Sequence, residues 1–169
     1  MSGQDQNSDK ASASDKRSER QARSSAARVY AVQALFQMEA ASQSADRVMR
    51  EFRQWRIGRE DEDPDMVSAE ADDALFSRIV DDAVNWQSRI DQMTDRALVA
   101  KWPIDRIDPV LRALFRCAGA ELVSKGTPPK VAIIEYVQIA QAFFPEGRES
   151  KFVNAVLDHM AREARPEAF

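Results

Sequence analysis

Two arginines, Arg112 and Arg116, lie four residues apart in a stretch with helical spacing, which places both guanidinium groups on one helical face. Such a face can bind phosphate groups, or it can simply be solvated. A second group could contact RNA, because Lys151 supplies charge, Phe152 a stacking surface and Asn154 a hydrogen bond to a base edge. Spacing alone favours a core position for Phe152.

Cysteine and histidine, which often catalyse reactions or bind metals, are scarce in this sequence, and its plentiful carboxylates are not at a spacing that specifies a reaction. It contains one cysteine and one histidine, so neither an internal disulfide nor a zinc site built from several such residues is expected. Cys117 lies in an apolar stretch and is expected in the core, whereas His159 is expected at the surface. The sequence also lacks a glycine-rich phosphate-binding loop. We therefore expect neither a catalytic site nor a cofactor.

The N-terminal region has its own composition. Residues 2–23 include five serines and no Val, Ile, Leu, Phe, Trp or Tyr, so we expect this segment to be disordered in isolation. Basic residues accumulate in its second half and just beyond it: Lys16, Arg17, Arg20, Arg23 and Arg28. Composition alone favours a solvated tail. The alternative is a basic arm that becomes ordered on an RNA backbone.

The overall charge conceals an uneven distribution. The 169 residues include 24 basic and 28 acidic side chains, and a net charge of −4 argues at first against a nucleic-acid partner. Residues 59–73, however, hold eight acids and one base and so carry −7, which leaves +3 for the remainder. We expect this acidic segment to be a solvated loop. Neither a long apolar run nor a signal sequence occurs, which favours a cytoplasmic protein without a membrane partner.

Apolar residues recur at spacings of three and four almost throughout the body, which indicates helices. Helices are expected over residues 26–41, 46–55, 68–99 with a possible break near Gln87, 109–125, 131–144 and 150–164. Trp102-Pro103 should end the third of these, because a residue before proline resists helical geometry. Asp108-Pro109 and Thr127-Pro128 each combine a capping side chain with proline at the first helical position.

The expected fold is all-α, a compact bundle of six to seven helices arranged as two sub-bundles, since no segment alternates as a strand would. The helix over residues 131–144 is apolar nearly all round and is expected to be the core that both sub-bundles share. Residues 1–23 would form a tail with a basic arm, 24–164 the helical domain and 165–169 a short C-terminal tail.

Four sequence blocks form a recognisable set: Ala27-Arg28 with residues 31–36 (AVQALF), residues 114–116 (LFR) with Glu121-Leu122, residues 129–133 (PKVAI) with Glu135, and residues 151–158 (KFVNAVLD). Together they resemble the NusB family of transcription antitermination factors. The blocks occur in consistent order over about residues 24–162. The chain departs from the family pattern at several places: Ser24-Ser25-Ala26 replace consecutive arginines, Phe36 a tyrosine, Ile134 an asparagine, Tyr136 a small residue and Ala155 a glycine.

The resemblance implies an all-helical, non-enzymatic protein that binds the boxA element of nascent rRNA transcripts. It also implies a protein partner, the small-subunit ribosomal protein NusE. Together the two proteins would help to load an antitermination complex on RNA polymerase, so that rRNA operons are read through.

The resemblance and the basic residues together give the candidate sites. RNA contacts are expected at Arg20, Arg23, Arg28, Gln33, Phe36, Arg112, Arg116, Lys151, Phe152 and Asn154. Lys130 and Glu135 are in a family motif whose role is either structural or at the partner surface. Two alternatives stay open: a helical protein–protein adaptor, and an accessory RNA-binding domain related to those of rRNA cytosine methyltransferases.

Overall fold

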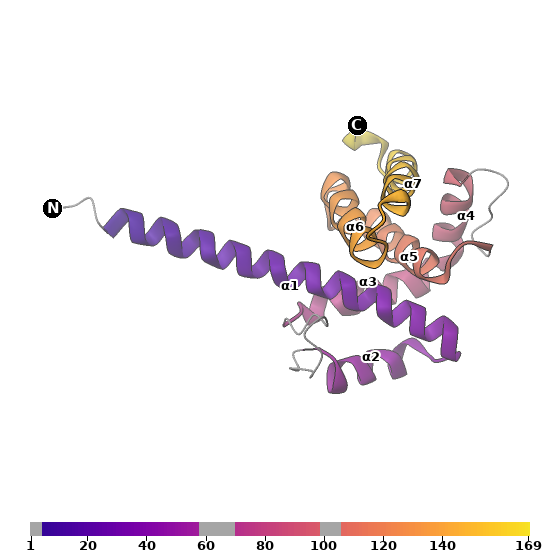
Figure 1. The fold of residues 1–169 in the computed structure, drawn as a ribbon, viewed down its shortest axis with the longest axis horizontal. Helices are drawn as coiled ribbons and strands as arrows, with labels where there is room; N and C mark the ends of the chain where they lie inside the picture. The colour runs from indigo at the N-terminus through magenta and orange to yellow at the C-terminus, as the bar shows by residue number, and fades with distance from the viewer. Residues whose placement is uncertain (1–4, 58–69, 99–105) are drawn as a thin grey trace.

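The computed structural model describes residues 5–57, 70–98 and 106–169, with side chains from residue 12 onward (Figure 1). Within these ranges the chain is helical. The helices are α1 (Asp5–Ala41), α2 (Ala45–Trp55), α3 (Asp73–Asn85), α4 (Gln87–Ala97), α5 (Pro109–Val123), α6 (Pro129–Phe143) and α7 (Arg148–Ala164), followed by a 3-10 turn, η2 (Pro166–Ala168). The predicted all-α fold is confirmed. Trp102-Pro103 and most of the acidic segment 59–73 lie outside the described residues.

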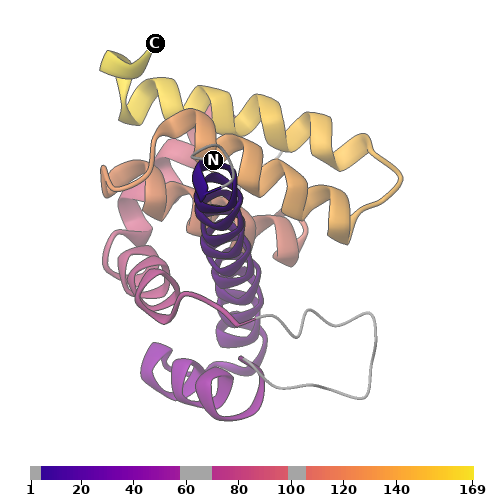
Figure 2. The ribbon, with the colours of Figure 1, turned by 90° about the vertical axis from the view of Figure 1, so that its left-hand side faces the viewer.

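The helices form two groups joined by α1 and α5. Seen along α1, helices α6 and α7 lie on one side and α2 and α3 on the other (Figure 2). Helix α1 contacts α2, α3, α5 and, less extensively, α6, whereas α5 contacts α1, α3, α4, α6 and α7. The shared central helix is therefore α5, and the prediction that residues 131–144 hold this position is wrong.

Small residues explain why α5 rather than α6 is central. Ala113, Ala118 and Ala120 are buried along α5, and a Cβ added to Gly119 would lie 2.3 Å from Cγ2 of Ile90 on α4. Small side chains at these positions let neighbouring helices approach the α5 backbone closely. Helix α6 is apolar nearly all round but keeps Ile134 58% exposed.

Helix α1 extends far beyond the expected start at residue 26. It projects away from the body as a single helix, and its side chains from residue 12 to 23 are exposed (Figure 1). Over residues 5–23 this differs from the disorder expected for residues 2–23 in isolation. The segment from Asp5 onward contains neither glycine nor proline, and it lengthens an existing helix, which avoids the cost of nucleation.

Capping side chains fix the starts of three other helices, with Ser44 before α2, Asp72 before α3 and Asp108 before α5. Asp72 accepts a 3.0 Å hydrogen bond from the Leu75 amide, and Asp108 accepts one of 2.8 Å from the Val110 amide, as expected for Asp108-Pro109. The break near Gln87 is also confirmed, since α3 ends at Asn85 and α4 begins at Gln87.

The expected Thr127 cap is wrong by one residue. Helix α6 begins at Pro129, with Pro128 in the capping position. The Thr127 hydroxyl instead donates a 2.8 Å hydrogen bond to Glu121 in the interior. At the other end of the chain, residues 165–169 include η2, and the Arg162 guanidinium lies 4.5 Å from the ring centroid of Phe169.

Candidate nucleic-acid interface

Arg28 points into the protein and ties α1 to α5. Its side chain is 6% exposed, and its Nε and Nη2 donate hydrogen bonds of 2.8 and 3.0 Å to the two carboxylate oxygens of Glu121. Burial alone would lower the pKa of Arg28, but the hydrogen bond and the negative charge of Glu121 outweigh it and raise the pKa. The Arg28 guanidinium is thus a structural group, buried between α1 and α5, and it is not exposed for the predicted contact with RNA.

A second carboxylate completes this buried cluster. The Nη1 atom of Arg28 lies 3.6 Å from Oε2 of Glu135, which also accepts a 2.8 Å hydrogen bond from the Ser25 hydroxyl. Glu135 is 6% exposed, so of its two expected roles the structural one fits. Lys130, from the same family motif, is exposed at the beginning of α6.

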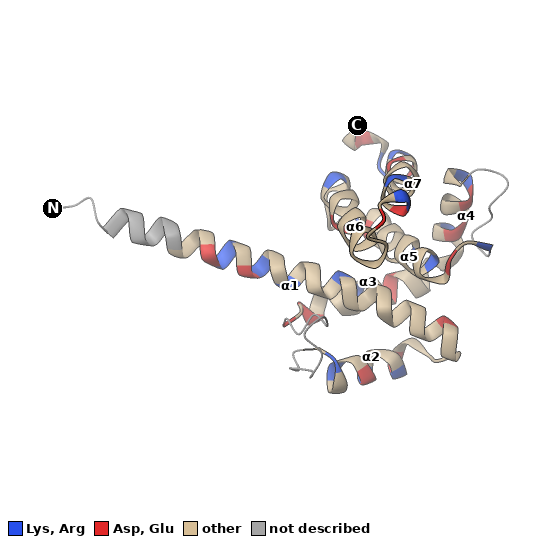
Figure 3. Ribbon diagram, viewed as in Figure 1, with Lys and Arg blue, Asp and Glu red and all other residues tan. Residues whose placement is uncertain are grey.

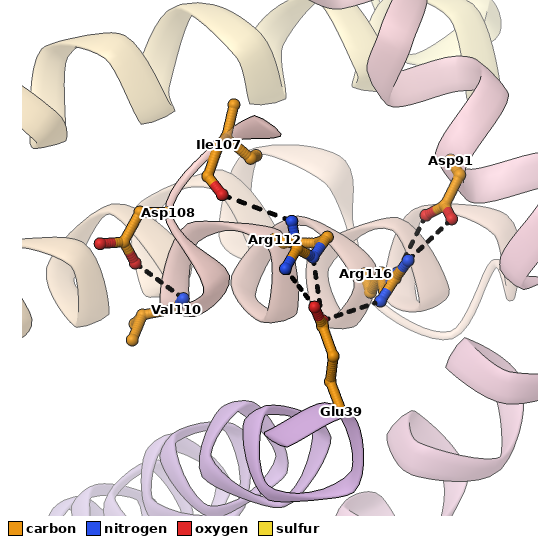
Figure 4. Close-up of polar contacts among 7 residues, drawn as sticks. All are labelled: Glu39, Asp91, Ile107, Asp108, Val110, Arg112 and Arg116. Carbon is orange, nitrogen blue, oxygen red and sulfur yellow. Dashed lines mark hydrogen bonds and ion pairs between the residues drawn. The ribbon is translucent and has the colours of Figure 1, made fainter. Parts of the chain in front are cut away.

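Arg112 and Arg116 share one face of α5, as their spacing predicts, but this face turns toward α1 and α4 (Figure 4). Arg112 forms a bidentate pair with Glu39 of α1, in which Nε lies 2.9 Å from Oε2. Arg116 donates two hydrogen bonds of 3.0 Å to Asp91 of α4, and its Nη1 lies 3.4 Å from Glu39. The hydrogen bond from Arg112 is the largest cause that lowers the pKa of Glu39. The two arginines thus join three helices.

Arg20 and Arg23 lie on the exposed part of α1, where acidic and basic side chains alternate (Figure 3). Both line a cleft of about 600 Å³ together with Glu70 and Asp72, at the beginning of α3. The backbone carbonyl of Arg23 accepts a 3.1 Å hydrogen bond from the Asp72 amide. The base of the arm is therefore anchored to the body and faces two acids there.

The C-terminal candidates divide between surface and core. Lys151 and Asn154 are exposed and lie three residues apart on α7, so both face solvent. Phe152 is half-buried, and its ring packs edge-to-face against Phe115 at a centroid distance of 6.1 Å. Phe152 is therefore largely a core residue, as its spacing favoured. Lys151 and Asn154 are the exposed polar candidates on α7.

Gln33 and Phe36 line a largely apolar groove of about 380 Å³ on α1. Phe36 is 39% exposed, and the Gln33 Oε1 atom is buried without a hydrogen-bond partner among the described residues. The remaining lining residues are Val32, Gln37, Ala40, Arg56, Val110 and Phe143. No sequence signal connects Arg56, Val110 and Phe143 with this site, because the segments that carry them meet only in the folded chain.

The two residues considered for catalysis are placed as expected. Cys117 is fully buried, which raises the pKa of its thiol well above the usual value. His159 is exposed on α7.

Comparison with known proteins decides the family. The model of the NusB family matches residues 25–162. The chain belongs to the NusB family. It is 46% identical over 145 residues to the transcription antitermination protein NusB of Maricaulis maris, covering 85% of this chain and 89% of that protein. It is 47% identical over 148 residues to the NusB protein of Granulibacter bethesdensis, covering 85% and 90% of the two chains.

Solved NusB structures share the fold. A crystal structure of NusB from T. maritima matches with a TM-score of 0.66 at 28% identity, covering 86% of this chain and 95% of that one. A crystal structure of the antitermination factors NusB and NusE in complex with dsRNA matches with a TM-score of 0.66 at 23% identity, covering 82% and 96%. The resemblance found in the sequence is thereby confirmed, and the related NusB proteins are named as transcription factors rather than enzymes.

The described helices were also tested as membrane spans. Over residues 5–57, 70–98 and 106–169, no helix is both long and apolar enough to cross a bilayer.

Proposed function

We propose that this NusB-family chain binds the boxA RNA of nascent rRNA transcripts together with NusE and promotes read-through of rRNA operons. The observation that carries the proposal is the family match over residues 25–162, with relatives 46–47% identical over most of their length. A NusB protein with the same fold has been crystallised with NusE and dsRNA, which supports RNA and NusE as partners here. The complex would act on RNA polymerase.

The exposed candidates define the RNA-binding surface that we propose. Arg20 and Arg23 supply positive charge for phosphates along the arm. Phe36, at the apolar groove, provides an exposed ring on which a base can stack. Lys151 and Asn154 add a charge and an amide on α7. Arg28 contributes indirectly, because its ion pair with Glu121 holds the buried part of α1 against α5.

NusE binding is proposed on the body of the protein. Lys130 is exposed at the first turn of α6, beside the exposed apolar side chains of Val131 and Ile134. Exposed apolar side chains bordered by polar residues mark protein–protein interaction sites. The same surface favours the second candidate function, a helical adaptor that binds proteins without RNA.

Mobility shifts of labelled boxA RNA, with and without NusE, test the proposal. We expect weak binding by the chain alone, tighter binding with NusE, and affinity that falls steeply with salt because phosphate contacts release counterions. Equal binding to a scrambled boxA sequence would contradict the boxA assignment. Binding of NusE without any RNA binding would favour the adaptor.

A further inference from the structure

The carboxylate of Glu39 receives two arginines from consecutive turns of α5 (Figure 4). Arg112 binds it through Nε and Nη2, and Arg116 approaches through Nη1 at 3.4 Å. Both arginines also have anchors of their own. Nη1 of Arg112 donates a 3.3 Å hydrogen bond to the Ile107 carbonyl, and Arg116 binds Asp91 through two bonds of 3.0 Å. The positions of the guanidinium groups therefore do not depend on Glu39 alone.

Glu39 is the most accessible member of this cluster. Its side chain is 36% exposed, against 10% for Arg112 and 18% for Arg116. It lies two residues before the last residue of α1, so it can turn into solvent without disturbing the core. A cavity of about 210 Å³, lined by Glu39 and Arg116 among others, adjoins the cluster and gives space beside the Arg116 guanidinium.

The chemistry of the cluster fits another anion as well as it fits a carboxylate. Arginine binds carboxylates and phosphates with the same forked geometry. An RNA phosphodiester carries one negative charge and two free oxygens, so it can replace a carboxylate without changing the local charge balance. The carboxylate of Glu39 is held only weakly by the two arginines, for two reasons. A partly exposed ion pair contributes little stability, and the C-terminal end of a helix disfavours negative charge.

We propose that Arg112 and Arg116 form an RNA phosphate site that the free protein fills with the carboxylate of its own Glu39. The inference rests on the proposed RNA-binding function. When RNA binds, a backbone phosphate takes the place of the carboxylate, and Glu39 turns into solvent. Glu39 thereby lowers the affinity for RNA by the cost of breaking its own ion pairs.

The variant Glu39→Gln tests this site, and Glu163→Gln is the matched control. Glu163 also pairs with an arginine, Arg96, at 2.5 Å, and its side chain is 33% exposed. We expect Glu39→Gln to tighten binding of single-stranded boxA RNA by about two- to fivefold relative to the control, since an exposed ion pair no longer has to break. Equal affinities of the two variants, measured by fluorescence anisotropy, would overturn the proposal.

NMR resonances of the arginine Nε–H groups distinguish a failure of this inference from a failure of the proposed function. In the wild-type chain, added RNA should shift the signals of Arg112 and Arg116 and leave that of Arg96 unchanged. This measurement decides the matter even if Glu39→Gln does not fold. RNA binding with unmoved signals would overturn the site and leave the function intact. Inorganic phosphate that shifts the two signals in Glu39→Gln, while neither chain binds RNA, would support the site and contradict the function.

Discussion

Arg28 and Glu121 form a bidentate ion pair between residues 93 positions apart, with side chains only 6% and 2% exposed. Glu121 also accepts the Thr127 hydroxyl, so the pair connects α1, α5 and the beginning of α6. The residue that the family resemblance marked as an RNA contact therefore belongs to the internal framework. We expect its substitution to affect RNA binding only through the position of α1.

Arg28→Ala should destabilise the fold strongly. The substitution leaves the carboxylates of Glu121 and Glu135 buried without their cation, a change that costs about 3–5 kcal/mol. Urea unfolding followed by circular dichroism measures the loss. The control Arg23→Ala removes an exposed arginine five residues earlier and should change stability by less than about 0.5 kcal/mol. Similar losses in both variants would contradict a structural role for Arg28.

Gly119→Ala tests the close contact between α5 and α4. The new methyl group would lie 2.3 Å from Cγ2 of the fully buried Ile90, and such overpacking costs about 1–3 kcal/mol. Ile90→Ala alone should also destabilise the protein, because it leaves a cavity. The double variant should lose less than the sum of the two single losses, as measured by thermal unfolding. Strict additivity would show that the two positions are not in contact.

Removing the charge of the arm should weaken RNA binding without unfolding the protein. The variant Arg20→Ala/Arg23→Ala should make the dependence of log affinity on log salt shallower by about 1.4, or 0.7 for each lost phosphate contact in a single strand. The melting temperature should stay unchanged, since both side chains are exposed. Arg50→Ala/Arg89→Ala removes the same charge from exposed positions on α2 and α4. An identical change of salt dependence in that control would point to a general charge effect.

The Glu39 ion pairs should stabilise the fold at neutral pH and not in acid. The hydrogen bond from Arg112 lowers the pKa of Glu39 below its unfolded value of 4.5. The contribution is therefore complete above about pH 4.5 and disappears as the pH falls through the folded-state pKa. Glu39→Gln should be less stable than wild type by at most about 1 kcal/mol at pH 7. Urea titrations of both proteins at several pH values should show the difference vanishing in acid.

Helix positions followed from local signals, whereas pairings between distant residues did not. Apolar spacing and the Asp108-Pro109 cap predicted helices that the structure contains. The apolar character of residues 131–144 did not identify the central helix, because burial depends on how closely other helices approach, and Gly119 permits that approach in α5.

In the candidate site, too, local sequence signals predicted which residues share a helix face but not which distant residues contact them. Spacing correctly placed Arg112 and Arg116 on one face of α5, but it could not show that Glu39 and Asp91 cover this face from two other helices. The helical state of residues 5–23 was missed for another reason. Composition reports the lack of apolar surface to bury, but not the support that a segment gains by continuing a helix already anchored in the core.

Because α1 is one continuous helix from Asp5 to Ala41, the orientation of the arm about the helix axis is fixed relative to the body. Arg20 and Arg23 point in directions set by the same helix that places Arg28 inside and Phe36 on the groove. Each residue of an α-helix advances the side chain by about 100° and about 1.5 Å. One residue inserted between Arg23 and Arg28 would therefore turn the arm arginines by more than a quarter turn, with their charge unchanged. The directions in which the arm arginines point are therefore fixed by the packing of α1 in the core.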